Sequence, residues 1–211
     1  MKTIRVVSGE YMIENEIKRS RFIATAKGEL NQEEAEAFVK SIKKKYPDAT
    51  HNCYAYVADE LGNIARFSYD GEPGGTAGQP ILDVIRKQGL VKTAVVVTRY
   101  FGGIKLGAGG LVGAYSEACA DVLSTSKIVE KKECKRVAIR SDYSIFATVE
   151  KYLFKTECKP LGFEYGDEVS GEIVVPLDAV DAFVEAINEL TSGKIMVKQG
   201  DEVFFDTTNR Q

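Results

Sequence analysis

The stretch Thr93–Gly110 reads TAVVVTRYFGGIKLGAGG and joins a run of β-branched residues to a glycine-rich segment. The run Thr93–Thr98 has no charged residue, which predicts a strand that is buried on both faces. The segment that follows predicts a shaped loop over Gly102–Gly110, and then a helix from about Gly110 to Ser126. The sequence therefore predicts a strand, a loop and a helix in direct succession.

The residues before this stretch predict four more strands and two more helices. The strands are expected at residues 11–16, 21–28, 52–58 and 64–69. Asn31 and Glu34 have the spacing of a capping box, so we expect the first helix to begin there. Thr76 and Gln79 repeat that spacing, and they predict a second capped helix at the end of the loop Asp70–Pro80.

The residues after Glu133 predict the order strand, helix, strand, strand, helix, strand. The strands are expected at residues 136–140, 161–165, 172–176 and 194–205. Asp142 or Ser144 is expected to cap the first helix, and Asp178 to begin the second. This order matches the ferredoxin-like βαββαβ pattern.

The distribution of charge also divides the chain. Residues 1–132 hold 19 basic and 16 acidic residues, a net charge of +3, whereas residues 133–211 hold 9 and 15, a net charge of −6. We therefore expect an α+β protein of two domains, residues 1–130 and 133–211, with the boundary near Ser126–Glu133.

The composition argues against several classes of protein. Of the 211 residues, 44% are apolar and 28% are charged, which argues against a disordered, fibrous or membrane protein. The net charge of −3 gives no reason for the whole chain to bind nucleic acid. The four cysteines form no CxxC pair, and the single histidine, His51, excludes a histidine-rich zinc site. We expect no metal, no cofactor and no signal peptide, and therefore a cytoplasmic protein with reduced thiols.

Two pairs of side chains could support catalysis. His51 and Cys53 alternate along one predicted strand, so they point to the same face, as a nucleophile and its base would. The alternative is that Cys53 is a small buried apolar residue. Asp70 and Glu72, which lie among glycines, could hold Mg²⁺ or act as acid and base. The alternative is that both carboxylates fix turns by accepting hydrogen bonds from backbone N–H groups.

A basic and aromatic set suggests a binding surface instead. The glycine loop could cradle a phosphate with its backbone N–H groups, although it lacks both the Walker A and the GxGxxG spacing. Basic side chains beside aromatic rings suit single-stranded nucleic acid, and the alternative is a solvated surface over core aromatics. The candidate binding residues are Arg19, Arg21, Arg99, Tyr100, Lys105, Gly107 and Gly109.

Two stretches carry a family resemblance. Phe67–Leu82, which reads FSYDGEPGGTAGQPIL, resembles the first signature of the IMPACT family, and Val96–Val112 resembles the second. Lys18–Phe22 and His51–Cys53 also fit, so the chain is identified as a member of the bacterial YigZ type over about residues 10–125. The signature residues of the first loop are Asp70, Gly71, Glu72, Pro73, Thr76 and Gly78.

Three positions depart from the family pattern. The family commonly has aspartate and serine where this chain has Tyr69 and Gly74, and it often has arginine where this chain has Gly113. The missing carboxylate weakens any paired-acid site, and the missing arginine reduces the basic surface.

The resemblance implies a fold and a role. The N-terminal domain would share the fold of the second domain of small-subunit ribosomal protein five, and the C-terminal domain would resemble the C-terminal domains of elongation factor G. Eukaryotic members regulate translation by binding the activator of an initiation-factor kinase. The resemblance implies no established enzymatic activity for bacterial members.

We therefore expect a non-enzymatic regulatory binding protein linked to translation, whose partner is RNA or a ribosome-associated factor and not a membrane. One alternative is a hydrolase that uses His51, Cys53 or Glu72 in a pocket at the glycine loops. Another is a protein–protein regulator without RNA contact. The RNA hypothesis predicts basic residues on one open face, the enzyme hypothesis predicts His51 and Glu72 within hydrogen-bond reach, and the third predicts an exposed apolar patch.

Overall fold

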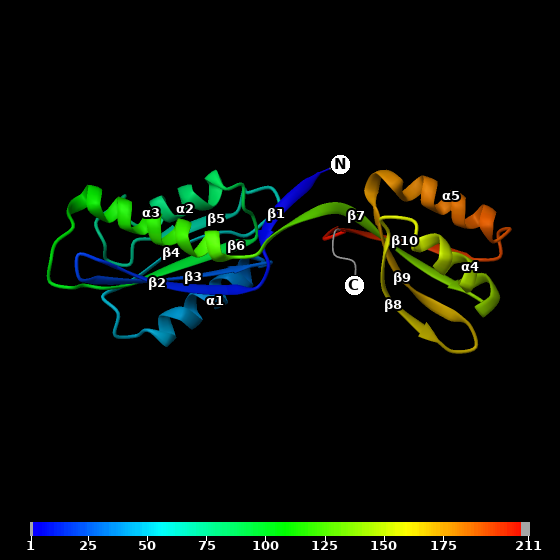
Figure 1. Cartoon of the computed structure of the whole chain (residues 1–211), viewed down its shortest axis with the longest axis horizontal. Helices are drawn as coiled ribbons and strands as arrows, with labels where there is room; N and C mark the ends of the chain where they lie inside the picture. The colour runs from blue at the N-terminus through cyan, green and yellow to red at the C-terminus, as the bar shows by residue number, and fades with distance from the viewer. Residues whose placement is uncertain (1, 208–211) are drawn as a thin grey trace. The chain divides into compact units, whose positions relative to one another are not determined.

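The computed structural model describes residues 2–207, and the contacts within it divide the chain into two compact units (Figure 1). One unit is Ile4–Val129, and the other is Glu130–Gln211 with Met1–Thr3. The protein is α+β, and its strands form two five-stranded sheets. No helix within residues 2–207 is long and apolar enough to cross a membrane.

The N-terminal unit is an antiparallel sheet with helices on both faces. Its elements are β2 (Glu10–Ile17), β3 (Ser20–Gly28), α1 (Gln32–Lys45), β4 (His51–Val57), β5 (Ala65–Ser68), α2 (Gly78–Lys87), β6 (Thr93–Tyr100) and α3 (Gly107–Thr125). The strand order is β2-β3-β6-β4-β5, so β6 lies in the centre. Every residue of β6 except Tyr100 is buried, which confirms the predicted strand with two buried faces. Helices α2 and α3 cover one face of this sheet, and α1 covers the other (Figure 1).

Alternate residues of β6 pack into two different cores. Val95 and Val97 lie in the core beneath α2 and α3, whereas Val96 lies in the core beneath α1. Because side chains alternate along a strand, Arg99 lies on the same face as Val95 and Val97, and Tyr100 lies on the same face as Val96. These two candidate binding residues therefore belong to opposite faces of the sheet.

The helix starts differ in how well the sequence predicts them. Asn31 and Glu34 form a capping box at the start of α1, as predicted. The capping box predicted at α2 is wrong, because the N-cap residue is Ala77 and no side chain caps the helix. Thr76 Oγ instead donates to the Pro73 carbonyl at 2.7 Å, inside a turn of the loop. Helix α3 begins at Gly107 and not near Gly110, so the last residues of the predicted glycine loop form its first turn.

The C-terminal unit is a second antiparallel sheet with two helices. Its elements are β7 (Ile128–Ser141), α4 (Tyr143–Leu153), β8 (Lys159–Tyr165), β9 (Val169–Pro176), the short 3₁₀ helix η1 (Leu177–Ala179), α5 (Val180–Leu190) and β10 (Met196–Phe205). The strand order β10-β7-β9-β8 is compatible with the predicted ferredoxin-like pattern. Asp142, one of the two predicted caps, is the N-cap residue of α4. Strand β1 (Thr3–Val7) was not predicted by the sequence patterns. Its residues Ile4–Val7 belong to the N-terminal unit, where Val7 packs in the core beneath α2 and α3.

Candidate functional site

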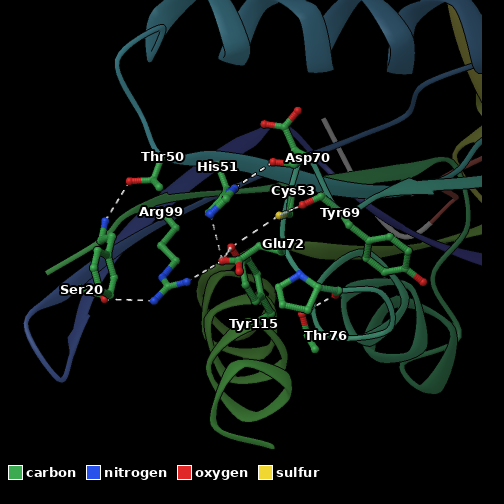
Figure 2. A network of polar contacts seen from close by, with 12 residues as sticks. Ser20, Thr50, His51, Cys53, Tyr69, Asp70, Glu72, Thr76, Arg99 and Tyr115 are labelled. Carbon is green, nitrogen blue, oxygen red and sulfur yellow. Dashed lines mark hydrogen bonds and ion pairs between the residues drawn. The ribbon is translucent and has the colours of Figure 1, made fainter. Parts of the chain in front are cut away.

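The centre of the candidate site is a buried carboxylate that is held by two partners (Figure 2). Glu72 lies in the signature loop, residues 70–78, and only 3% of its side chain is exposed. Its Oε1 accepts a hydrogen bond from Arg99 Nη1 at 2.6 Å and another from the Tyr115 hydroxyl at 2.7 Å. The arginine compensates the buried negative charge, as a carboxylate removed from water requires. Because the three residues come from the loop, β6 and α3, this contact ties the three segments together.

Sheet register and aromatic rings place the Arg99 side chain. Arg99 is the register partner of His51 across β6 and β4. Its guanidinium carbon lies 5.5 Å from the ring centre of Phe22 and 5.5 Å from that of Phe101. Its Nη2 donates to Ser20 Oγ at 3.3 Å. Only 6% of the side chain is exposed, so the charge of Arg99 is directed into the protein and not toward solvent.

His51 and Lys43 hold the start of the signature loop at Asp70. His51 Nδ1 lies 2.8 Å from the Asp70 carbonyl oxygen, which can only accept, so Nδ1 carries the proton. The Asp70 carboxylate accepts from Lys43 Nζ at 2.6 Å and from the Asn52 N–H at 2.7 Å. Burial raises the pKa of Asp70, but these two donors outweigh burial and hold the pKa below its ordinary value. Asp70 has a left-handed φ of 46°, a strained conformation that these contacts stabilise.

Cys53 is a buried, protonated thiol. Its Sγ donates to the Tyr69 carbonyl at 2.9 Å and lies 3.4 Å from the Tyr115 hydroxyl oxygen. Burial, reinforced by the nearby carboxylates of Glu72 and Asp70, raises the pKa of Cys53 to about 12. A thiol with this pKa holds very little thiolate at neutral pH, so Cys53 is a poor nucleophile in the folded protein.

We expect all four cysteines to be unreactive in the folded protein. Cys53, Cys119, Cys134 and Cys158 are buried. A pKa of about 12 leaves roughly one Cys53 side chain in ten thousand as thiolate at pH 8. Titration with a chromogenic disulfide reagent should show no fast-reacting thiol before unfolding, and all four after denaturant is added. One fast-reacting thiol in the folded protein would instead favour the enzyme hypothesis.

The candidate catalytic residues share one face of the sheet but do not form a catalytic pair. His51 Nε2 lies 3.8 Å from Glu72 Oε1, beyond hydrogen-bond distance, and Arg99 and Tyr115 already occupy that oxygen. Asp70 and Glu72 each bind a different cation. Within residues 2–207, no three His, Cys, Asp or Glu side chains lie close enough together to hold a metal ion. These contacts hold the signature loop in place, Glu72 through Arg99 and Tyr115 and Asp70 through Lys43.

The candidate basic residues do not share one open face. Arg21 and Tyr100 are register partners on the α1 side of the sheet, and the Arg21 guanidinium carbon lies 5.2 Å from the ring centre. Arg21 is also paired with Glu14 through two hydrogen bonds. Arg19 is exposed in the turn between β2 and β3, where its φ is 65°. Arg99 is buried on the opposite side of the sheet, so it is not part of the open surface that the RNA hypothesis predicts.

The segment from β6 into α3 exposes apolar side chains and bare backbone. The exposed fraction is 47% for Phe101, 40% for Ile104 and 38% for Val112. Lys105 is the only charged residue in the sequence 101–112. We call the exposed residues between Phe101 and Val112 the glycine face. A Cβ atom would meet no other atom within 4 Å at Gly103, Gly107 or Gly109.

A shallow hollow lies beside the glycine face. Its volume is about 250 Å³, and its lining includes Gly75 of the signature loop, Pro80 of α2 and Val112 of α3. The hollow shows that the signature loop and the first turns of α3 border the same surface. Gln79, Asp83, Lys87 and Ser116 also line the hollow, so its lining is partly polar. The third hypothesis, a protein–protein regulator, predicts exposed apolar side chains such as Phe101, Ile104 and Val112.

Several contacts of the site have no signal in the sequence. Tyr115 of α3 is fully buried, but its hydroxyl bond to Glu72 depends on the path of a distant loop. The contact of Lys43 with Asp70 and that of Ser20 with Arg99 also join distant segments. The one available signal was a buried helical tyrosine, because a buried phenol usually needs a hydrogen-bond partner.

Comparisons with known proteins match both halves of the chain. The family described as the Impact N-terminal domain matches residues 18–123, and a domain of unknown function, DUF1949, matches residues 139–194. The IMPACT family member YvyE of Bacillus subtilis is 40% identical over 90% of this chain and 88% of YvyE. The family member YigZ of Escherichia coli is 32% identical over 93% of this chain and 98% of YigZ. A crystal structure of a hypothetical protein is 31% identical, with a TM-score of 0.64 over 93% of this chain and 97% of that one.

Proposed function

Because the chain belongs to the IMPACT family, we propose that its N-terminal unit is a non-enzymatic module that binds a protein partner through the glycine face. In this proposal the partner is a translation-linked factor, and neither RNA nor a small substrate binds at this face. The contact of Glu72 with Arg99 and Tyr115 serves the module by holding the signature loop against β6 and α3.

Gly109 is the observation that carries this proposal. It lies in the first turn of α3, its φ is not left-handed, and a Cβ there would meet no atom within 4 Å. Glycine in a helix is less stable than alanine by about 1 kcal/mol, so the fold alone favours another residue at this position. A bare backbone is useful where a second surface must approach closely. We infer that the partner makes this approach.

The chemistry of the glycine face favours a protein over RNA. Nucleic-acid binding draws much of its affinity from contacts between cations and phosphates. The segment 101–112 holds the single cation Lys105, and the turn against which Gly102 packs adds the exposed Lys18 and Arg19. Phe101, Ile104 and Val112 instead present apolar surface of the kind that marks protein interfaces. The neighbouring hollow of about 250 Å³ has room for one side chain of a partner.

The link to translation comes from the family resemblance. Eukaryotic members act by binding another protein, the activator of an initiation-factor kinase. In this chain the buried pair of Glu72 and Arg99 holds the signature loop in place, and the glycine face exposes apolar side chains. This arrangement suits regulation by binding another protein. The family role therefore favours a translation-linked protein as the partner.

Site-specific photo-crosslinking tests the proposal. A photoreactive phenylalanine analogue is placed at Val112 in the full chain, which is expressed in Bacillus subtilis cells that lack YvyE. We expect a discrete protein adduct that resists ribonuclease, and we expect mass spectrometry to identify the captured protein as one that cosediments with ribosomes.

Leu61 provides the matched control position. It lies in the same unit, in the turn between β4 and β5, and is 65% exposed. The same analogue at Leu61 should not give the adduct obtained at Val112. The proposal fails if ribonuclease removes the adduct, or if both positions capture the same proteins.

A further inference from the structure

A cleft on the α1 side of the N-terminal sheet has the features of a second binding site. It lies between α1 and strands β4 and β5, and its volume is about 410 Å³, which is enough for a small ligand. Lys40 and Lys43 line it from α1, Tyr54 from β4 and Arg66 from β5. We propose that this cleft binds a nucleoside phosphate, either as a free nucleotide or as the terminal nucleotide of single-stranded RNA.

Cations from two elements supply the contacts to phosphate. Lys40 and Arg66 are exposed, and beside the hydrogen bond from Gln32 their charges help to lower the pKa of the Glu36 carboxyl group. Arg66 Nη1 also donates to the Ala65 carbonyl at 3.1 Å. The planar guanidinium of Arg66 can offer two parallel N–H groups to phosphate oxygens. Of the described lining residues, Glu36 is the one carboxylate, and it accepts hydrogen bonds from Tyr56 at 3.3 Å and from Gln32 at 3.1 Å. The lining is therefore basic overall.

Tyr54 supplies an aromatic surface beside these cations. Its ring is partly exposed and lies nearly parallel to that of Tyr56, with an angle of 7° between the planes and 6.2 Å between the centres. The Lys43 ammonium lies 5.7 Å from the centre of the Tyr54 ring. A flat base can pack against Tyr54 while its phosphate meets the cations, and stacking with phosphate contact is the usual basis of recognition for unpaired nucleotides.

Lys43 connects this cleft to the signature loop. Its Nζ donates to the Asp70 carboxylate at 2.6 Å, and the Asp70 carbonyl oxygen lies 2.8 Å from His51 Nδ1. A phosphate in the cleft would compete with the Asp70 carboxylate for Lys43. Loss of the Lys43 contact would alter the position of Asp70, and therefore the surroundings of His51. Since His51 is the only histidine of the chain, the imidazole signals in an NMR spectrum all come from this residue and report this event. The cleft is independent of the proposed function, because docking at the glycine face could fail while the cleft still binds.

Titration of the full chain with ADP, followed by NMR, tests this assignment. We expect saturable binding and a shift of the His51 imidazole signals. The variant Lys40→Ala/Arg66→Ala should bind ADP about tenfold more weakly or worse, because two charge-assisted contacts are lost. Tyr54→Ala should also weaken binding by about tenfold, the cost of losing one stacked base. The control variant Arg86→Ala/Lys87→Ala removes two exposed basic residues from α2, outside this cleft, and should bind ADP like the wild type.

A parallel titration with 5′-phosphorylated hexaadenylate distinguishes the two sources of the ligand. Tighter binding of the oligonucleotide than of ADP would assign the cleft to an RNA end, and equal or weaker binding would assign it to a free nucleotide. The assignment is overturned if ADP does not saturate at millimolar concentration, or if Lys40→Ala/Arg66→Ala retains wild-type affinity. It is also overturned if ADP binds while the His51 signals stay fixed.

Discussion

Replacement of Arg99 by alanine is expected to lower the free energy of unfolding of the N-terminal unit by about 3–5 kcal/mol, the usual cost of leaving a buried charge without its partner. Glu72 would keep the Tyr115 hydroxyl at 2.7 Å but lose Arg99 Nη1 at 2.6 Å. Water cannot readily replace that partner, because 3% of the Glu72 side chain is exposed. Urea unfolding followed by circular dichroism should show a lower midpoint at an unchanged slope.

Two companion variants separate the buried charge from other effects of the substitution. Arg21→Ala removes an exposed arginine from a neighbouring strand, and its partner Glu14 is exposed too, so the midpoint should stay close to that of the wild type. Glu72→Gln added to Arg99→Ala should recover part of the loss, because the unpaired charge is gone while Tyr115 keeps an acceptor. An Arg99→Ala protein with wild-type stability would show that the contact between Arg99 and Glu72 does not stabilise the fold.

Gly102→Ala is expected to destabilise the N-terminal unit by about 3 kcal/mol, at the upper end of the usual cost of overpacking. An added Cβ would lie 1.9 Å from the Arg19 carbonyl oxygen. The Gly102 N–H also donates to Ser20 Oγ at 3.2 Å, so the loop is fixed on the turn between β2 and β3. A flexible side chain could move aside, but here the backbone of the turn is in the way. Thermal melting measures the effect.

Gly74→Ala is the matched control for this substitution. A Cβ at Gly74 would meet no atom within 4 Å, and its φ is not left-handed. Its melting temperature should therefore stay constant or rise slightly, because alanine restricts the unfolded chain. Equal melting temperatures for Gly102→Ala and Gly74→Ala would mean that the loop does not depend on its packing against the turn.

Local sequence patterns predicted most elements of the fold, because each pattern contains its own physical cause. The β-branched run Thr93–Thr98 is buried on both faces because β6 lies between β3 and β4 in the sheet. The errors occurred where a residue has two local uses. Thr76 has the spacing of a helix cap, but its hydroxyl is used inside a turn, on the Pro73 carbonyl. Gly107 suits a loop and the start of a helix equally, and here it begins α3.

The candidate site was predictable only in part, because its contacts join residues that are distant in the sequence. The alternation of β4 correctly places His51 and Cys53 on one face. The sequence suggests Arg99 as a ligand for phosphate, but the fold brings it to Glu72, 27 residues earlier in the chain. No local pattern shows which partner an arginine will find, so its role depended on the register of β6 and the return path of the signature loop.

Gly109→Ala tests the central claim, that the first turn of α3 lacks a side chain at Gly109 because a partner binds close to its backbone. The helix should become more stable by up to about 1 kcal/mol, since alanine favours a helix and its Cβ would meet no atom within 4 Å. The same variant should reduce the yield of the Val112 adduct about tenfold, because the added methyl group keeps the partner away from the backbone.

Gly113→Ala, one turn further along α3, is the control for this measurement. Its Cβ would also meet no atom within 4 Å, and family members often have arginine at this position, so a side chain there should be tolerated. We predict that both variants gain stability and that only Gly109→Ala loses the adduct. A Gly109→Ala protein that is destabilised, or that forms the adduct at the wild-type yield, would contradict the claim.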